Sequence, residues 1–283
     1  MVRTTIHVMR HGEVDNPQGV LYGRMPGYHL TPRGHAMAQM VADYLVETGK
    51  DITVVTTSPL ERAVESGAPT AAAFGINAGT DARLLEAENH FEGVAVNRNR
   101  WVLAHPEHWA YYINPLRPSW GEPYTQLVAR MSAAVRSALV QARGHEALLV
   151  SHQLPIWSLS LYLHGRPLAH DPRRRQCSLA SLTSLTFEDN TLVGLAYTEP
   201  ANALLREAED MVPGSGVAGL KIGDGEGRAL ASRRRIRSPK IRGLRRRRSQ
   251  LGRASPVAQP RIVRQLRTAA RPSPDTAGQL PAS

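Results

Sequence analysis

Short apolar runs alternate with longer segments of helical periodicity along roughly the first 200 residues of the chain. Runs rich in β-branched or apolar residues at 4–9, 52–56 and 147–151 predict strands, and a further short strand is expected to end near Leu85. Helices are predicted from Thr31 to Gly49, from Ser58 to about Ala73, from about Pro123 to Arg143, and from Leu154 to Leu163. This alternation predicts an α/β fold: a three-layer sandwich in which a mostly parallel central sheet has helices on both faces.

Local signals mark the ends of several of these elements. Thr31-Pro32 has the form of an N-cap followed by proline in the first helical turn. Ser58-Pro59-Leu60-Glu61 has the form of a capping box. Two β-type runs at 181–187 and 192–197, joined by Glu188-Asp189-Asn190, predict a closing hairpin.

The regular pattern fades after about Glu207. Residues 208–230 are rich in glycine, and residues 231–283 contain no aromatic side chain. Such segments cannot bury enough apolar surface to offset the entropy lost on ordering. We therefore predict one domain over 1–207, a glycine-rich linker over 208–230 and a disordered, arginine-rich tail over 231–283.

The positive charge of the chain is concentrated in this tail. The whole chain has a net charge of +11, whereas 231–283 hold 15 Lys+Arg and one acidic residue, which leaves a net charge of −3 for the remainder. A tail of this kind could bind nucleic acid or an anionic surface. A solvated extension without a partner is the simpler interpretation, and we prefer it.

Cysteine content and hydropathy limit the class of protein. The single thiol, Cys177, cannot form an internal disulfide and is too few for a cysteine metal site, so a reducing compartment is expected. The most apolar window, 147–163, is interrupted by His152, Gln153 and Pro155, and predicts no membrane span. We expect a soluble cytoplasmic protein, and the sequence gives no indication of its oligomeric state.

Polar side chains suited to phosphate chemistry lie at or just after the predicted strand ends, namely Arg10-His11, Arg62, Glu86 and His152. In an open parallel sheet, ligands bind at the carboxyl ends of the strands. Two arginines can hold a phosphoryl group, an imidazole can attack phosphorus, and a carboxylic acid can protonate the leaving oxygen. The arginines and histidines supply the positive charge that a metal would otherwise provide, so we predict neither a metal ion nor a cofactor.

Several motifs occur together in the order of a known family. They are Arg10-His11-Gly12-Glu13; Leu30-Thr31 with Gly34; 58–66, which begins Ser58-Pro59-Leu60-Glu61-Arg62; Leu85-Glu86 through Phe91-Glu92-Gly93; Gly121-Glu122; Ser151-His152; and Cys177-Ser178. Through them, residues 4–200 resemble the histidine phosphatase superfamily, in its phosphoglycerate mutase-like branch.

The resemblance implies a role for each of the polar residues. His11 would be the nucleophile that carries the phosphoryl group as phosphohistidine. Arg10, Arg62 and His152 would bind that group, and His152 would also take part in catalysis. Glu86 would act as the general acid for the leaving group and then as the base for water.

The chain also departs from the family pattern. The acid motif is one residue short, so Glu88 rivals Glu86 for the acid role. Asn16 follows His11 at five residues rather than six and is a candidate substrate ligand, as is Arg24 in the same loop. Gln153 stands where a glycine is common after the second histidine.

The connection at 94–122 contains several tryptophans and tyrosines among prolines and histidines, a composition typical of an insertion that covers a substrate. On the basis of the polar residues at the strand ends and of the resemblance, the leading hypothesis is a metal-independent phosphomonoesterase that acts on a small phosphorylated metabolite through phosphohistidine. One alternative is a bisphosphoglycerate-dependent phosphoglycerate mutase. Another is a catalytically inactive domain whose basic tail binds nucleic acid or another anion.

Overall fold

A computed structural model describes residues 1–94 and 121–210 of the chain. Almost all of the predicted insertion at 94–122, and nearly all of the predicted linker and tail, lie outside the described residues. Within the described residues, no helix combines the length and the apolar character needed to cross a membrane.

Six strands form one sheet in the order β3-β2-β4-β1-β5-β6. Their bounds are β1 Arg3–Arg10, β2 Ile52–Thr57, β3 Gly79–Thr80, β4 Glu146–Ser151, β5 Leu182–Glu188 and β6 Thr191–Thr198. Strands β1 to β4 pair in parallel, whereas β5 and β6 form the predicted hairpin and pair antiparallel at the β1 edge.

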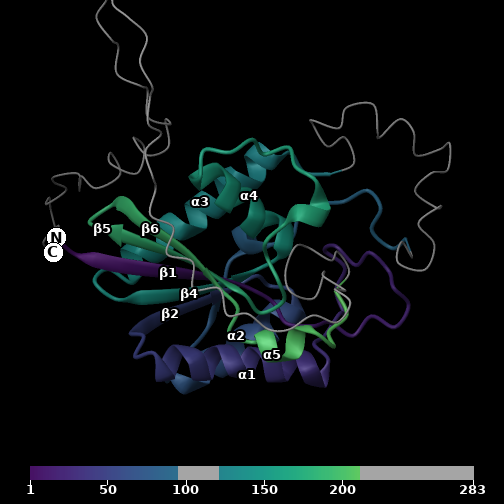
Figure 1. Cartoon of the computed structure of the whole chain (residues 1–283), viewed down its shortest axis with the longest axis horizontal. Coiled ribbons are helices and arrows are strands. Elements are labelled where there is room, and N and C mark those ends of the chain that lie inside the picture. The colour runs from purple at the N-terminus through teal and green to yellow at the C-terminus, as the bar shows by residue number, and fades with distance from the viewer. Residues whose placement is uncertain (95–120, 211–283) are drawn as a thin grey trace, which may run out of the picture.

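Helices cover both faces of this sheet (Figure 1). Helices α1 (Pro32–Glu47), α2 (Glu61–Ala73) and the short α5 (Asn202–Leu205) lie on one side, and α3 (Tyr124–Gln141) and α4 (Gln153–Leu163) lie on the other. The predicted three-layer α/β sandwich is confirmed.

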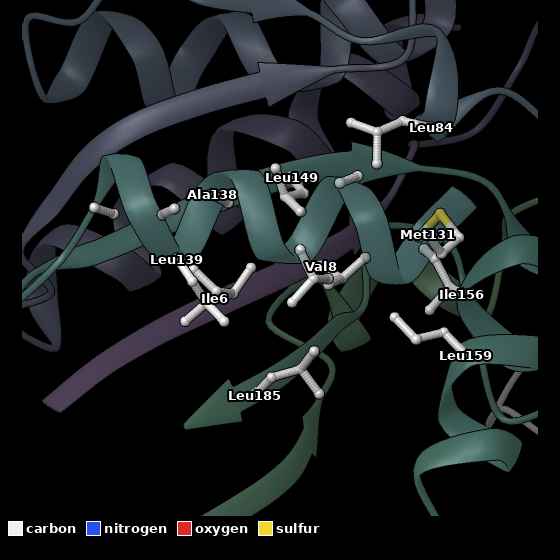
Figure 2. Close-up of a cluster of buried hydrophobic side chains, with 14 of the residues drawn as sticks. Ile6, Val8, Leu84, Met131, Ala138, Leu139, Leu149, Ile156, Leu159 and Leu185 are labelled. Atoms are coloured by element: carbon white, nitrogen blue, oxygen red, sulfur yellow. The ribbon is translucent and has the colours of Figure 1, made fainter. Parts of the chain in front are cut away.

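The alternation of side chains along the central strands fills both interfaces. In β1, Ile6 and Val8 point toward α3 and α4, where Figure 2 shows them among Leu139, Met131 and Ile156. Met9 points to the opposite face and packs with residues of α1 and α2. Strands buried on both faces leave only their ends open to a ligand.

Two local predictions were wrong. The short strand does not reach Leu85: only Gly79 and Thr80 pair with β2, and Asp81 then caps a 3₁₀ helix, Ala82–Leu84, by accepting from the backbone N–H of Arg83. Ser58 does not cap α2, which begins at Glu61 after Leu60. The Ser58 hydroxyl is hydrogen-bonded to His152 instead, at 2.8 Å.

The strand register brings the two motif histidines together. Arg10, the last residue of β1, is the register partner of Ser151, the last residue of β4. The residues that follow, His11 and His152, therefore leave the sheet side by side. Strand β1 connects through α1 to β2, which lies on the far side of β4 in the sheet. The site therefore lies at a topological switch point, where ligands bind in open α/β sheets.

Candidate active site

His11 is buried directly beyond β1, with 2% of its surface exposed. Its backbone N–H donates to the carbonyl of Ser151, and its Nδ1 lies 2.8 Å from the carbonyl oxygen of Gly12. A carbonyl can only accept, so Nδ1 carries the proton and Nε2 of the neutral ring keeps a free lone pair. The local fold thus selects the tautomer in which Nε2 carries the lone pair.

The glycines of the first two motifs permit a close approach of two backbones. A Cβ atom on Gly12 would lie 2.6 Å from the carbonyl oxygen of Gly34, and one on Gly34 would lie 2.1 Å from that of Glu13. Both distances are shorter than any tolerable contact, so the first turn of α1 can pack against the His11 loop only with glycine at both positions.

His152, the N-cap residue of α4, is fully buried beside His11, with the two ring centroids 5.2 Å apart. Its Nε2 is hydrogen-bonded to Ser58, while its Nδ1 is buried and has no partner within the described residues. If the Ser58 hydroxyl donates to Nε2, then Nδ1 carries a proton that can be donated to a ligand.

Arg62 lies in the first turn of α2 and is completely buried. Its Nη2 donates to the carbonyl of Gly23 at 2.6 Å, and its guanidinium carbon is 4.7 Å from the ring centroid of Tyr22. Nε and Nη1 are buried without an acceptor in the part of the chain that the structure describes. A buried cation with unused donors at a helix N-terminus is a favourable partner for an anion.

Arg10 is buried as well, but its terminal nitrogens are engaged. Nη1 donates to the carbonyl of Cys177 at 2.7 Å, and Nη1 and Nη2 donate to the two carboxylate oxygens of Asp210 at 2.8 and 2.7 Å. Burial lowers the pKa of Arg10, but the Asp210 carboxylate more than offsets this and raises it. Of the guanidinium nitrogens, Nε has no acceptor among the described residues.

Burial and neighbouring cations keep both histidines neutral. The pKa of His11 is held well below its usual value by burial and by the charges of Arg62 and Arg10. Burial and the same two arginines also lower the pKa of His152. Neutral imidazole is the form that can act as a nucleophile, so the electrostatics match the tautomer of His11.

Glu86 and Glu88 occupy different environments. Glu86 lines the cavity, and burial raises the pKa of its carboxyl, as a general acid requires. The Glu88 side chain is 69% exposed and forms an ion pair with Arg24 at 2.7 Å. The geometry therefore favours Glu86 as the acid.

Two arginines hold the chain that carries Glu86. Arg130 of α3 donates to the carbonyls of Arg83, Leu85 and Glu86, and it is paired with Glu122. Arg24 donates to the same Glu86 carbonyl at 2.6 Å. These contacts fix the backbone of the acid loop from two sides.

The two candidate substrate ligands have other partners. The three donor nitrogens of Arg24 are directed at Glu86, Glu88 and Glu122, so this side chain supports the acid loop. The Asn16 side chain exchanges two hydrogen bonds with the backbone of Val20. Neither residue is among those that line the cavity.

A cavity of about 390 Å³ lies over His11. Besides His11, Arg10 and Glu86, its wall contains residues that we did not select from the sequence: Tyr22, Tyr124, His170 and Arg175. Arg175 is almost fully buried and donates to Gln153 and His170. The only sequence signal for it is the run Arg173-Arg174-Arg175 just before the Cys177-Ser178 motif. Among the described residues, no group of three or more metal-ligating side chains is present.

Comparison with known proteins places the chain in a family. The family model described as the histidine phosphatase superfamily (branch 1) matches residues 6–199. The chain is 50% identical over 198 residues to the uncharacterized protein Rv0525 of Mycobacterium tuberculosis, a match that covers 70% of this chain and 97% of that protein. It is 31% identical over 191 residues to a protein of Yersinia pestis named probable phosphoglycerate mutase GpmB, covering 65% of this chain and 86% of that protein.

Solved structures share the fold at lower sequence identity. A mycobacterial glucosyl-3-phosphoglycerate phosphatase superposes with a TM-score of 0.54 at 22% identity, covering 65% of this chain and 90% of that one. A putative α-ribazole-5′-P phosphatase from Escherichia coli superposes with a TM-score of 0.54 at 23% identity, covering 68% and 95% of the two chains. At these identities the likeness concerns the fold.

Proposed function

The chain belongs to the histidine phosphatase superfamily, branch 1, and on this premise we propose that it is a metal-independent phosphomonoesterase that works through a phosphohistidine on His11. The observation that carries the proposal is the pairing of a neutral, buried His11 with buried cationic donors that have no acceptor within the described residues. Such donors suit a bound phosphoryl group.

In the first step, Nε2 of His11 attacks phosphorus and forms an N–P bond while the P–O bond to the alcohol breaks. Arg62, Arg10 and His152 bind the phosphoryl oxygens, and their charges and N–H groups stabilise the transition state. Glu86 donates its proton to the departing alcohol oxygen.

In the second step, the Glu86 carboxylate accepts a proton from water as the water oxygen attacks phosphorus. The N–P bond breaks, phosphate is released, and Glu86 is protonated again. Each turn therefore consumes one phosphate ester and one water and returns His11 and Glu86 to their starting states.

A mutase is the second candidate, because one relative carries the name probable phosphoglycerate mutase. The chemistry at His11 would be the same, with a substrate hydroxyl in place of water as the final acceptor. Sequence 94–122 lacks the longer cap segment with charged motifs that true mutases carry, which favours hydrolysis. Conversion of 3- to 2-phosphoglycerate, assayed with and without bisphosphoglycerate, separates the two activities.

The decisive experiment is hydrolysis of p-nitrophenyl phosphate in the presence of a chelator. We expect His11→Ala to lower kcat/KM at least about 1,000-fold, because the covalent intermediate cannot form. Rapid acid-free quenching and mass spectrometry should find the phosphoryl group on His11 in the wild type.

His164→Ala provides the matched control. His164 is an exposed histidine at the end of α4, and its Nδ1 bonds the carbonyl of Ser160. Equal activity in wild type and His11→Ala, with both folded, would refute the proposal. The inactive, tail-binding alternative predicts no turnover by any variant.

A further inference from the structure

Arg175 is a buried cation in the wall of the cavity. It follows a 3₁₀ turn at Pro172–Arg174 and precedes β5, and 9% of its surface is exposed. Burial lowers the pKa of its guanidinium. A cation in this position is costly unless something compensates its charge.

The two hydrogen bonds that Arg175 donates go to neutral groups. Nε donates to Nε2 of His170 at 2.9 Å, and Nη1 donates to the side-chain oxygen of Gln153 at 3.1 Å. No carboxylate in the described part of the chain lies within ion-pair distance of it, and its Nη2 donates to none of the described residues. These neutral groups therefore hold the guanidinium in place, and it forms no ion pair with any described residue.

His170 is oriented to accept from Arg175. Its Nδ1 lies 2.6 Å from the carbonyl oxygen of Leu168, so Nδ1 carries the proton and Nε2 offers a lone pair. Burial lowers the pKa of His170, and Arg175 lowers it further, which keeps the ring neutral. The rings of Tyr124 and Trp157 pack around it, with centroids 5.5 and 6.2 Å away.

Gln153, the second support, is a feature in which this chain departs from the motif of its family. It is the first residue of α4, directly after His152, where glycine is common. A glycine at this position would have no side chain to accept from Nη1 of Arg175. The residue by which this chain departs from the family motif is thus also one of the two side chains that hold Arg175 in position.

Arg175 shares the wall of the cavity with His11 and Glu86. The cations that most lower the pKa of His11 are Arg62 and Arg10, the proposed phosphoryl ligands. Arg62, Arg175 and Arg10 all lower the pKa of Glu86, the proposed acid. A substrate whose phosphoryl group lies at His11 would place its alcohol part in the rest of this cavity, where Arg175 is a buried cation.

We propose that Arg175 is a specificity-determining residue that binds an oxyanion, a carboxylate or a second phosphate, in the alcohol part of the substrate, with Gln153 and His170 as its positioning residues. The proposal rests on the proposed phosphatase function and narrows its substrate class to phosphate esters of anionic alcohols. A planar guanidinium whose Nη2 donates to none of the described residues is suited to either group.

Two matched pairs of phosphate esters test it. 3-Phosphoglycerate and glycerol 3-phosphate differ by a carboxylate in place of a hydroxymethyl group, and 1,3-propanediol bisphosphate and 3-hydroxypropyl phosphate differ by a second phosphate. We expect the wild type to favour the anionic member of one pair by roughly 10- to 100-fold in kcat/KM, as for a hydrogen bond to a charged group. The pair with the larger ratio identifies the anion.

Arg175→Gln should bring the kcat/KM values of that pair to within about threefold of each other, because the charge-assisted bond is lost. Arg175→Lys keeps the charge and should retain part of the ratio. Gln153→Gly, which restores the common family residue, should lower the ratio in the same direction by loosening Arg175. Thermal unfolding of each variant tests whether it is folded.

Calorimetric titration with the same four esters tests the proposal without turnover. A wild type that binds and hydrolyses both members of each pair equally would overturn it, as would an Arg175→Gln variant that is folded and keeps the wild-type ratio. Hydrolysis of p-nitrophenyl phosphate by the wild type reports separately on the proposed phosphatase function. If that hydrolysis fails while the calorimetric preference persists, the phosphatase function is excluded and the anion site stands.

Discussion

Glu86 and Glu88 illustrate how environment assigns chemistry to one of two similar side chains. They are two residues apart and both border the cavity, but the Glu88 side chain is 69% exposed and paired with Arg24. Burial raises the pKa of the Glu86 carboxyl, because the charged form loses solvation. At the residue scale, therefore, the two carboxylates should respond differently to the same substitution.

We expect Glu86→Gln to lower kcat/KM by roughly 100-fold or more with an alkyl phosphate such as glycerol 3-phosphate, which needs a proton on its leaving oxygen. The loss should be much smaller with p-nitrophenyl phosphate, whose leaving group departs without one. Glu88→Gln is the control and should leave both rates close to wild type. An equal loss with both substrates would remove Glu86 from the acid role.

The expected pH profile of the activity follows from the ionisation of His11 and Glu86. Activity needs neutral His11, whose pKa is lowered, so the rate rises with pH as that imidazole loses its proton. It also needs protonated Glu86, whose pKa is raised, so the rate falls as pH increases through that value. For an alkyl phosphate we expect a bell-shaped kcat/KM profile with its maximum on the acid side of neutrality.

In Glu86→Gln the descending limb of this profile should disappear, because the amide does not titrate. Initial rates of the wild type and of Glu86→Gln, measured between about pH 4 and pH 9 in buffers of constant ionic strength, would test whether the descending limb is lost. A descending limb that survives the substitution would have to belong to another group.

At the scale of elements, the segment after α5 lies against the signature loop. The backbone N–H of Glu209 donates to the Glu13 carboxylate at 2.7 Å, and the Asp210 carboxylate accepts from both terminal nitrogens of Arg10. The carboxylate thus occupies donors that a phosphoryl group would use. The segment follows residue 207, where the predicted domain ends.

Substitution of Asp210 should therefore change the affinity for phosphate. Because a carboxylate competes with phosphate oxygens for Arg10, we expect Asp210→Asn to lower the inhibition constant of inorganic phosphate by about 5- to 10-fold. Glu207→Gln is the control, since Glu207 is an exposed carboxylate of the same segment that pairs with Arg33 at 3.6 Å. Weaker phosphate inhibition in Asp210→Asn would mean that Asp210 supports Arg10 and does not compete for it.

At the scale of the whole molecule, the family model matches residues 6–199, and a long segment with many basic residues follows this match. The relative from Mycobacterium tuberculosis matches over 97% of its own length while covering 70% of this chain. The described residues up to 210 contain the six-stranded sheet, helices α1 to α5 and the ion pair between Arg10 and Asp210. The residues beyond this point carry more positive charge than the net +11 of the whole chain, because the remainder is negative.

A chain that ends after residue 210 should therefore fold and keep its kcat/KM for p-nitrophenyl phosphate within about twofold of the full chain, because no side chain of the proposed mechanism is removed. If the tail binds nucleic acid, the full chain should bind nucleic acid in a filter-binding assay, and its affinity should fall steeply as the salt concentration rises. The truncated chain should not bind. A truncated chain that is folded but inactive would show that the tail takes part in catalysis.

The sequence by itself determined the fold class, the order of the main elements and the identity of the family. Periodicity and turn signals are local properties of the sequence. The pattern of apolar positions within β1 or α1 is enough to predict the element and the face that it buries. The motif residues His11, Arg62 and His152 were also visible, because each follows or begins an element whose position the pattern fixes. Comparison with known proteins confirmed the family.

Only the tertiary structure decided which polar groups meet. Arg10 pairs with Asp210 across 200 positions of sequence, and Arg130 reaches the carbonyl of Leu85 across 45. Arg175 appeared in the sequence as part of a basic run, and folding buries it beside Gln153. Local patterns carry no information on such contacts, because the sheet brings together chain segments that are far apart in sequence. The same limit explains why burial, and not spacing, separates Glu86 from Glu88.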